Sequence, residues 1–293
     1  MKKMEIKRAR TDRRKLSINH VKRIGLAFLF LLPAILLFAY FKILPIFETV
    51  YGSFFRYNIM DSSKNIFVGI DNYANTLKSD LFWVSLKNAA ELYMWQLVLG
   101  FWVPVLQGLC ISELVRGKGL ARLGYLLPTA LSSFAGLSVW KYIWEPEGGL
   151  ANQFLEIFGM GPYQWYGSEE LVKFALRFPC ILGGGGTVII IAVAISNIPS
   201  ELFEAAKIDG AGAFRRIWHI SLPGARYTIF LMFLMGLTGS LLAFNDVYMI
   251  TQGGPGYSSF TVVFGIYTKA FRENNFGMAM AMSVILCLGF LTS

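Results

Sequence analysis

Long uncharged stretches divide this sequence, and each has the length of a membrane-crossing helix. About 20 residues of α-helix span the hydrocarbon core of a bilayer. The stretches of about that length without Asp, Glu, Lys or Arg are 24–41, 92–112, 123–140, 178–200, 227–245, 247–268 and 274–293. Their alternation with charged segments predicts a polytopic membrane protein built of helices.

The stretch 247–268 is predicted not to be a simple span. It contains Gly253-Gly254-Pro255-Gly256 followed by Tyr257-Ser258-Ser259, which breaks helical hydrogen bonding where lipid offers no substitute. We expect a loop followed by a short helix that reaches or re-enters the membrane face. The expected fold class is therefore an all-α polytopic membrane protein with six transmembrane helices. Residues 45–88 are expected to lie as short helices on the outer surface.

Composition excludes a soluble globule. Hydrophobic residues make up 55% of the chain and charged residues 15%, whereas soluble domains carry about 25% charged residues. The same figures exclude a disordered chain, a collagen and a disulfide-stapled secreted domain. Cys110, Cys180 and Cys287 all fall in apolar stretches, so we interpret them as small buried hydrophobes without a metal or disulfide framework.

The distribution of basic residues predicts the orientation. Segments 1–23, 113–122 and 201–226 hold 17 of the 27 Lys and Arg residues, and basic residues are retained on the cytoplasmic face. The N-terminus is therefore expected inside, with 1–23 as a basic cytoplasmic tail and 24–293 as the transmembrane domain. The net charge of +9 is explained by topology and contact with anionic lipid. Nucleic-acid binding is the poorer alternative, because the tail is not a folded aromatic and basic surface.

The inner loop 198–223 carries the most specific pattern. Ser200 follows Pro199 and can cap a helix, Glu201 favours the first turn, and Gly210 can end the helix in a left-handed conformation. This predicts a short helix, a turn and a second short helix between spans four and five. Small residues on one face suit such a pair to a groove on a cytoplasmic partner. An ordinary amphipathic interfacial loop is the alternative on these residues alone.

The same loop resembles the signature loop of the membrane subunits of binding-protein-dependent ABC importers. The matching residues are Glu204, Ala205, Ala206, Asp209, Gly210, Ile220, Leu222 and Pro223. Further stretches resemble the carbohydrate branch, in particular the larger membrane subunit of maltose-type transporters. They are Phe67-Val68-Gly69-Ile70-Asp71-Asn72-Tyr73, Leu127-Pro128 and Thr251-Gln252-Gly253-Gly254-Pro255-Gly256.

The resemblance implies a permease subunit in a bacterial cytoplasmic membrane that forms half of a pathway for a carbohydrate, in particular an oligosaccharide. It implies a second homologous permease, two cytoplasmic ATPase subunits coupled through 198–223, and an extracellular sugar-binding protein. The chain itself is expected to bind no cofactor, with ATP and Mg used by the partner ATPase. A secondary carrier for a small solute is the alternative function.

Several absences shape the functional expectation. The chain has no phosphate-binding loop of the Gly-x-x-x-x-Gly-Lys type and no paired catalytic or metal-ligating residues, so it is expected not to be an enzyme. Glu91 and Asp246 lie at predicted outer span ends, where solvent would reach them. They are therefore expected to be interfacial, which argues against a proton-coupled carrier.

The candidate pathway residues come from the resemblance. Matching to the family's sugar contacts gives Thr129, Ser133, Leu182, Gly183, Gly186, Gly236, Gly239, Ser240 and Ala243. Close helix packing remains the alternative explanation of the glycine run 183–186. Phe244 and Tyr248, one turn apart, are candidates for an aromatic sugar platform at the entrance, with core packing as the alternative.

Overall fold

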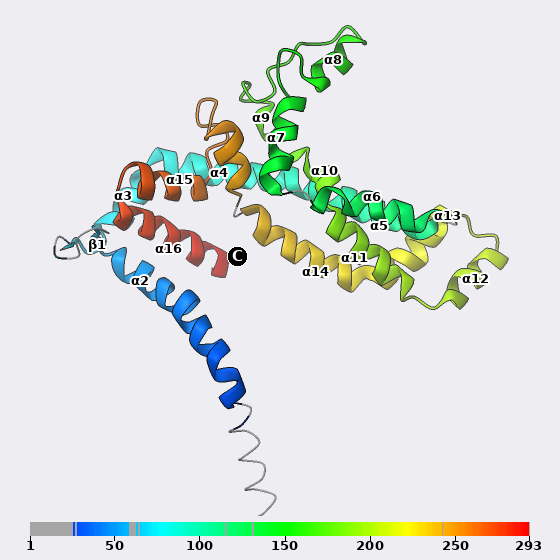
Figure 1. The fold of residues 1–293 in the computed structure, drawn as a ribbon, viewed down its shortest axis with the longest axis horizontal. Coiled ribbons are helices and arrows are strands. Elements are labelled where there is room, and N and C mark those ends of the chain that lie inside the picture. The colour runs from blue at the N-terminus through cyan, green and yellow to red at the C-terminus, as the bar shows by residue number, and fades with distance from the viewer. Residues whose placement is uncertain are drawn as a thin grey trace, which may run out of the picture.

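The computed structural model describes residues 26, 28–58, 63, 65–114, 116–130, 132–241 and 243–292 and shows an elongated, mostly helical chain (Figure 1). The basic tail 1–23 lies outside the described residues. The first half contains η1 (Ala39–Ile43), α2 (Leu44–Gly52), β1 (Phe55–Arg56), β2 (Ile66–Phe67), α3 (Asp71–Lys78), α4 (Asp80–Trp95), η3 (Gln96–Trp102), α5 (Val103–Glu113), α6 (Lys118–Leu126), η4 (Pro128–Ala130) and α7 (Ser133–Ile143). The second half contains α8 (Leu150–Glu156), α9 (Val172–Arg177), α10 (Cys180–Gly183), α11 (Gly185–Ser196), α12 (Ser200–Ile208), α13 (Ala213–Arg216), η5 (Ile217–Ser221), α14 (Leu222–Leu241), η6 (Val247–Thr251), α15 (Val262–Tyr267), η7 (Thr268–Arg272) and α16 (Phe276–Thr292).

Two continuous helices are long and apolar enough to cross a membrane. They are Phe28–Gly52, with 25 residues, and Asp80–Glu113, with 34 residues. Two bent pairs, Lys118–Ala130 with Phe134–Ile143 and Val172–Leu182 with Gly185–Ser196, raise the number to four among the described residues if each pair is one span. The chain is thus a mostly helical membrane protein, and the six-span topology stays a prediction.

The helices differ from the uncharged stretches in length and in continuity. The first helix continues through Pro45 to Gly52, so residues 45–52 extend a span instead of forming a separate surface helix. The stretch 123–140 bends by 99° between its two helices. Pro128 has no backbone N–H to continue the helical ladder, and Ser132 caps the second helix by accepting from the Ala135 N–H at 3.2 Å.

The stretch 247–268 is broken, as predicted. The π-helix η6 ends at Thr251 and α15 begins at Val262, with an intervening loop that has Gln252, Gly253 and Gly256 at positive φ. Buried Asn88 holds this loop against α4, because its amide donates to the carbonyls of Tyr257 at 2.7 Å and Phe260 at 3.1 Å.

A short antiparallel pair, β1 and β2, follows the first helix, with Phe55 opposite Phe67 and Arg56 opposite Ile66. The helical expectation for 45–88 did not include these strands. The side-chain amide of Asn72 on α3 donates to the carbonyls of Ser53 at 2.8 Å and Phe55 at 2.9 Å. These two bonds fix the turn where α2 ends and β1 begins. The Asp71-Asn72-Tyr73 motif therefore has a structural role beside the end of the first helix.

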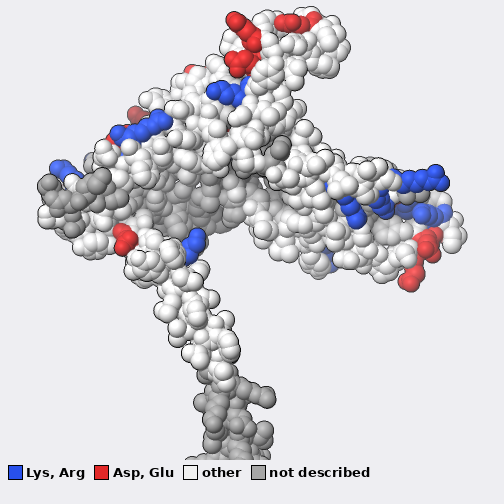
Figure 2. Space-filling view, viewed as in Figure 1, with Lys and Arg blue, Asp and Glu red and all other residues white. Residues whose placement is uncertain are grey.

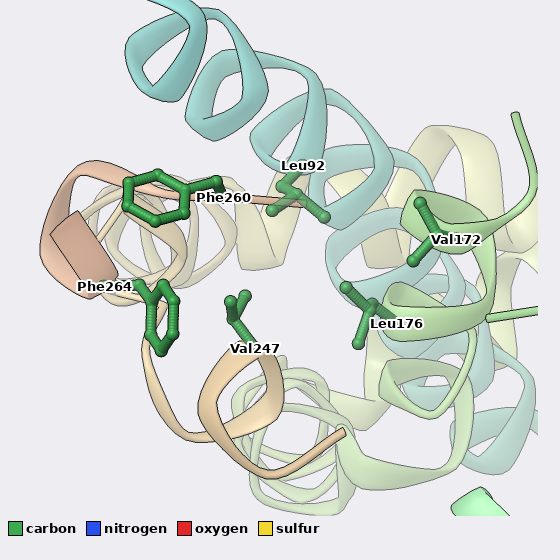
Figure 3. Packing of buried hydrophobic residues seen from close by; sticks show 6 residues of the cluster. All are labelled: Leu92, Val172, Leu176, Val247, Phe260 and Phe264. Atoms are coloured by element: carbon green, nitrogen blue, oxygen red, sulfur yellow. The ribbon is translucent and has the colours of Figure 1, made fainter. Parts of the chain in front are cut away.

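Two apolar clusters hold the body together. One joins α5, α11 and α14 through Val105, Leu109, Ile191 and Ala225, three helices that run side by side in Figure 1. The other joins α4, α9, η6 and α15 through Leu92, Val172, Leu176, Val247, Phe260 and Phe264 (Figure 3).

Cys110 and Cys287 are exposed on the chain and Cys180 is half-buried. Their expected burial is therefore wrong for the first two within the described part of the chain.

Candidate functional site: a central cavity and a terminal helical pair

A cavity of about 1010 Å³ lies where the two clusters meet. Its walls come from η3, α7, the α9–α11 segment, α14 and the residues just before η6. It lies at the upper end of the range of about 300–1,000 Å³ typical of small-molecule sites. Its lining is mainly apolar, with a few polar groups that include Gln96, Arg177, Asn245 and Asp246.

Five of the predicted pathway residues line this cavity. They are Leu182, Gly186, Gly236, Gly239 and Ala243. Thr129 is not in the lining, and its hydroxyl donates to the Leu126 carbonyl at 2.7 Å. The side chains of Ser133 and Ser240, and the surroundings of Gly183, lie outside the described part of the structure. The sequence did not indicate that Gln96 or Arg177 would line the cavity, and both come from other segments of the chain.

The glycine run contains two different kinds of glycine. A Cβ on Gly184 would lie 2.3 Å from Pro104 Cγ, and one on Gly185 would lie 1.9 Å from the Tyr125 carbonyl oxygen. These two glycines allow close helix approach. A Cβ on Gly186 would meet nothing within 4 Å. Helix packing therefore explains Gly184 and Gly185, whereas Gly186 faces the open cavity.

Asp246 lies in a buried ion pair. Its Oδ2 is 3.0 Å from Arg177 Nη1, with the two side chains 12% and 8% exposed. The expectation that solvent reaches Asp246 is therefore wrong, because α9 brings a guanidinium against it. Burial raises the pKa of the Tyr166 phenol, and the Asp246 charge raises that pKa further. Glu91 remains 41% exposed and pairs with Lys87 and Lys173.

Phe244 and Tyr248 stack on each other, with ring centroids 5.2 Å apart. Both pack against the Leu92 and Phe264 cluster, and both rings also contact Tyr267. Only Phe244 of the two lines the cavity. Core packing therefore accounts for Tyr248, while Phe244 contributes to both the core and the cavity wall.

The 198–223 loop forms the predicted helix, turn and helix at one end of the molecule (Figure 1). Ser200 does not cap α12, because Pro199 is the residue before the helix and Ser200 is its first residue. Gly210 has φ +74°, as predicted. The Ala211 N–H donates to the Ala206 carbonyl at 2.8 Å and the Gly210 N–H to the Lys207 carbonyl at 3.0 Å, which is a Schellman ending.

This helical pair exposes large apolar side chains. Ile208 is 87% exposed and Phe214 79%, and Leu202 and Trp218 are also exposed. Phe203, Ile217 and Leu222 instead pack against the α5, α11 and α14 cluster. The predicted residues Glu204, Ala205, Asp209 and Gly210 are exposed, Ala206 and Ile220 are half-buried, and Leu222 and Pro223 begin α14. The pair thus has one face anchored to the body and one uncovered face.

An ion pair ties the turn to the end of α5. Arg216 contacts Glu113, with both side chains 15% exposed. Its Nη1 also donates to the Ala211 carbonyl at 2.8 Å. Residues 211–216 are therefore fixed to the long helix Asp80–Glu113, whose η3 segment lines the cavity.

Figure 2 shows acidic side chains over the region of α8, whereas the tip that holds α6, α12 and α13 carries mainly basic side chains together with acidic ones in the region of α12. The segment 145–170, which contains α8, carries Glu145, Glu147, Glu156, Glu169 and Glu170.

Residues 125–293 match the family described as binding-protein-dependent transport system inner membrane component. The chain is 31% identical over 270 residues to the probable ABC transporter permease protein YurN of Bacillus subtilis, covering 89% of this chain and 90% of that protein. It is 31% identical to the diacetylchitobiose uptake system permease protein NgcF of Streptomyces coelicolor, covering 94% and 81%. It is 28% identical to the arabinooligosaccharides transport system permease protein AraP of Bacillus subtilis, covering 89% and 83%.

The fold is also similar to a solved structure. A chain of a bacterial ABC transporter involved in the import of the acidic polysaccharide alginate superimposes with a TM-score of 0.81. The match covers 94% of each chain at 22% sequence identity.

The two kinds of glycine predict opposite responses to one added methyl group. Gly185→Ala should lower the free energy of unfolding by about 1–3 kcal/mol, because the methyl group meets a backbone carbonyl that cannot move freely. Gly186→Ala should be neutral or stabilising by up to about 1 kcal/mol, because the site is open and Ala favours the helix. Thermal unfolding of each variant in the same detergent measures the difference. Equal destabilisation by both would show that Gly186 is a packing glycine.

Proposed function

The chain belongs to the family of binding-protein-dependent transport system inner membrane components, the permease subunits of ABC transporters, and we propose that it imports a carbohydrate, in particular an oligosaccharide. It is an inner membrane permease and not itself an enzyme. The observation that carries the proposal is the large cavity whose walls include Gly186, Gly236 and Gly239. Membership of the family sets aside a secondary carrier.

The carbohydrate assignment draws on the cavity and on the relatives. Lining positions without side chains leave room for a chain of sugar units, and polar groups such as those of Gln96 and Asn245 supply hydrogen-bonding partners. Relatives that match most of this chain carry names that specify diacetylchitobiose and arabinooligosaccharides. In this proposal, Leu182, Gly186, Gly236, Gly239 and Ala243 contact the solute. Thr129, Ser133, Gly183 and Ser240 lie near its path.

A second homologous permease subunit is proposed to complete the pathway. The helix Phe28–Gly52 has none of its most apolar window buried within the chain, and an apolar surface of that length needs a covering. Lipid and the second subunit supply it in the assembled importer. An extracellular sugar-binding protein delivers the solute, as expected for a binding-protein-dependent system.

Two cytoplasmic ATPase subunits are proposed to drive the importer, one of them docked on the 198–223 loop. The exposed Leu202, Ile208 and Phe214 provide an apolar face for a groove on the ATPase. The Arg216 and Glu113 pair would carry movement of the docked pair into α5. ATP and Mg are bound by the ATPase, and this chain is proposed to bind no cofactor.

The N-terminus is proposed to be cytoplasmic, with six spans in residues 24–293. The distribution of charge supports this orientation, because the tip that holds α12 and α13 is mainly basic whereas the α8 region is acidic (Figure 2). The acidic α8 region would then face outward.

Cysteine labelling tests the orientation. In a chain with Cys110, Cys180 and Cys287 replaced by Ala, Tyr257→Cys should react with a membrane-impermeant maleimide added to intact cells, because Tyr257 is 57% exposed in the proposed outer loop. Ala213→Cys should react only after the cells are opened. The reverse pattern would overturn the orientation, and outside labelling of both would show that the number of spans is wrong.

The turn at Gly210 tests the coupling. Gly210→Val should reduce sugar uptake by the assembled importer at least tenfold, because a β-branched residue does not adopt φ +74° and the helical pair would change its shape. Gly210→Asn should retain most uptake, because Asn tolerates the left-handed region. The measurement is ATP-dependent uptake in proteoliposomes, normalised to the ATPase bound per permease. Full uptake by Gly210→Val with bound ATPase would show that this turn is not the coupling element.

A further inference from the structure

The cavity wall contains one buried ion pair that the proposed sugar contacts do not include. Arg177, at the end of α9, and Asp246, just before η6, both line the cavity. Arg177 Nη1 and Asp246 Oδ2 are 3.0 Å apart, and the side chains are 8% and 12% exposed. Neither residue lies in the glycine run or the coupling loop.

The neighbours of this pair hold it in place. Leu176 and Val247, the residues next to Arg177 and Asp246, face each other across the core cluster shown in Figure 3. Leu176 is 2% exposed and Val247 is fully buried. Because α9 and η6 are packed together at these positions, the guanidinium and the carboxylate are presented side by side at the cavity.

The pair leaves hydrogen-bonding capacity unused. Nε and Nη2 of Arg177 have no hydrogen-bond partner among the described residues, and neither does the Tyr166 hydroxyl. Buried donors of this kind are ordinarily paired. Because Arg177 lines the cavity, a solute with oxygen acceptors is a natural partner for these two nitrogens.

The chemistry of the wall selects the class of solute. Arg177 and Asp246 together carry no net charge, so an anionic solute gains little from the cation and is repelled by the adjacent carboxylate. Neighbouring hydroxyl groups of a sugar suit both partners, since their oxygens accept from the guanidinium and their hydrogens are donated to the carboxylate. Trp140, which lines the same cavity, adds an aromatic surface.

We propose that Arg177 and Asp246 form a binding subsite for adjacent hydroxyl groups of a neutral sugar unit. The inference rests on the proposed function, because it names the solute class that the same cavity accepts. It adds two specificity-determining residues, one from α9 and one from the start of η6, to the small residues of α11 and α14.

A purely structural ion pair is the competing explanation, and a double substitution separates the two. Removing one partner leaves an uncompensated buried charge, whereas replacing both by apolar residues of similar volume preserves folding in many proteins. Arg177→Met with Asp246→Leu therefore removes the polar subsite without leaving an isolated charge. A structural pair predicts that this double variant imports sugar normally, and a sugar subsite predicts that it does not.

The experiment uses the complete importer, with its ATPase and binding protein, in proteoliposomes. The solutes are radiolabelled maltotriose, xylotriose and arabinotriose as neutral sugars and trigalacturonate as an acidic one. The readout is sugar imported per ATP hydrolysed, because capture by the binding protein precedes entry into the permease. We expect the wild type to import at least one neutral trisaccharide. The double variant should assemble and retain binding-protein-stimulated ATPase activity, with import per ATP lowered about tenfold or more.

A neighbouring ion pair provides the matched control. Lys173 is also on α9 and pairs with Glu91 outside the cavity lining, so Lys173→Met with Glu91→Leu should keep the wild-type ratio. If the Arg177 and Asp246 double variant does not assemble, Asp246→Asn keeps the side-chain shape. It should lower import per ATP several-fold, since an amide is a weaker acceptor than a carboxylate.

The outcomes distinguish this inference from the proposed function. Import of a neutral sugar by the wild type with an unchanged ratio in the Arg177 and Asp246 variants would overturn the subsite and leave the proposed function standing. Import of trigalacturonate alone would also overturn the subsite, because the solute would then be anionic. Failure of the wild type to import any of the four sugars would contradict the proposed function, and the subsite with it.

Discussion

Close helix contact through glycine is the constraint on which this structure depends. A Cβ on Gly108 of α5 would lie 2.9 Å from the Val188 carbonyl oxygen and 3.0 Å from Ile191 Cβ on α11. With Gly184 against Pro104, the two helices approach as nearly as their backbones allow. In a membrane, where lipid is as apolar as leucine, such contact and the dispersion energy it provides hold helices together. α14 then packs on the same pair through Ala225.

That packing also determines where open space can exist. Gly184, just before α11, and Gly185, its first residue, make the close contacts, whereas the next residue, Gly186, borders the cavity. The same helix leads through Pro199 into α12 at the far tip. The cavity wall and the helical pair are therefore two ends of one packed unit, and the Arg216 and Glu113 pair closes the connection through α5. A packed unit of this kind suits the proposed transfer of movement from an ATPase at the helical pair to the cavity.

Local signals in the sequence were sufficient to predict the short elements. The left-handed turn at Gly210 and the break after Thr251 followed from glycine and proline chemistry over a few residues. The bend near Pro128 has a comparable local signal, but the length of the uncharged stretch 123–140 predicts one unbroken span there. The Arg177 and Asp246 pair had no local signal, because its partners lie on different elements and meet only through tertiary packing. For the same reason, residue type alone did not show that Gly185 serves helix packing whereas Gly186 borders the cavity.

If Gly186 borders the path of an oligosaccharide, as proposed, uptake by a Gly186 variant should depend on sugar length. The importer carrying Gly186→Phe is compared with wild type and with Val193→Phe, an exposed position on α11 outside the cavity lining. We expect Gly186→Phe to retain binding-protein-stimulated ATPase activity and to lose uptake of longer oligosaccharides far more than of disaccharides, while Val193→Phe shows no such length dependence. Equal loss at every length, or no loss at any, would show that Gly186 does not border the sugar path.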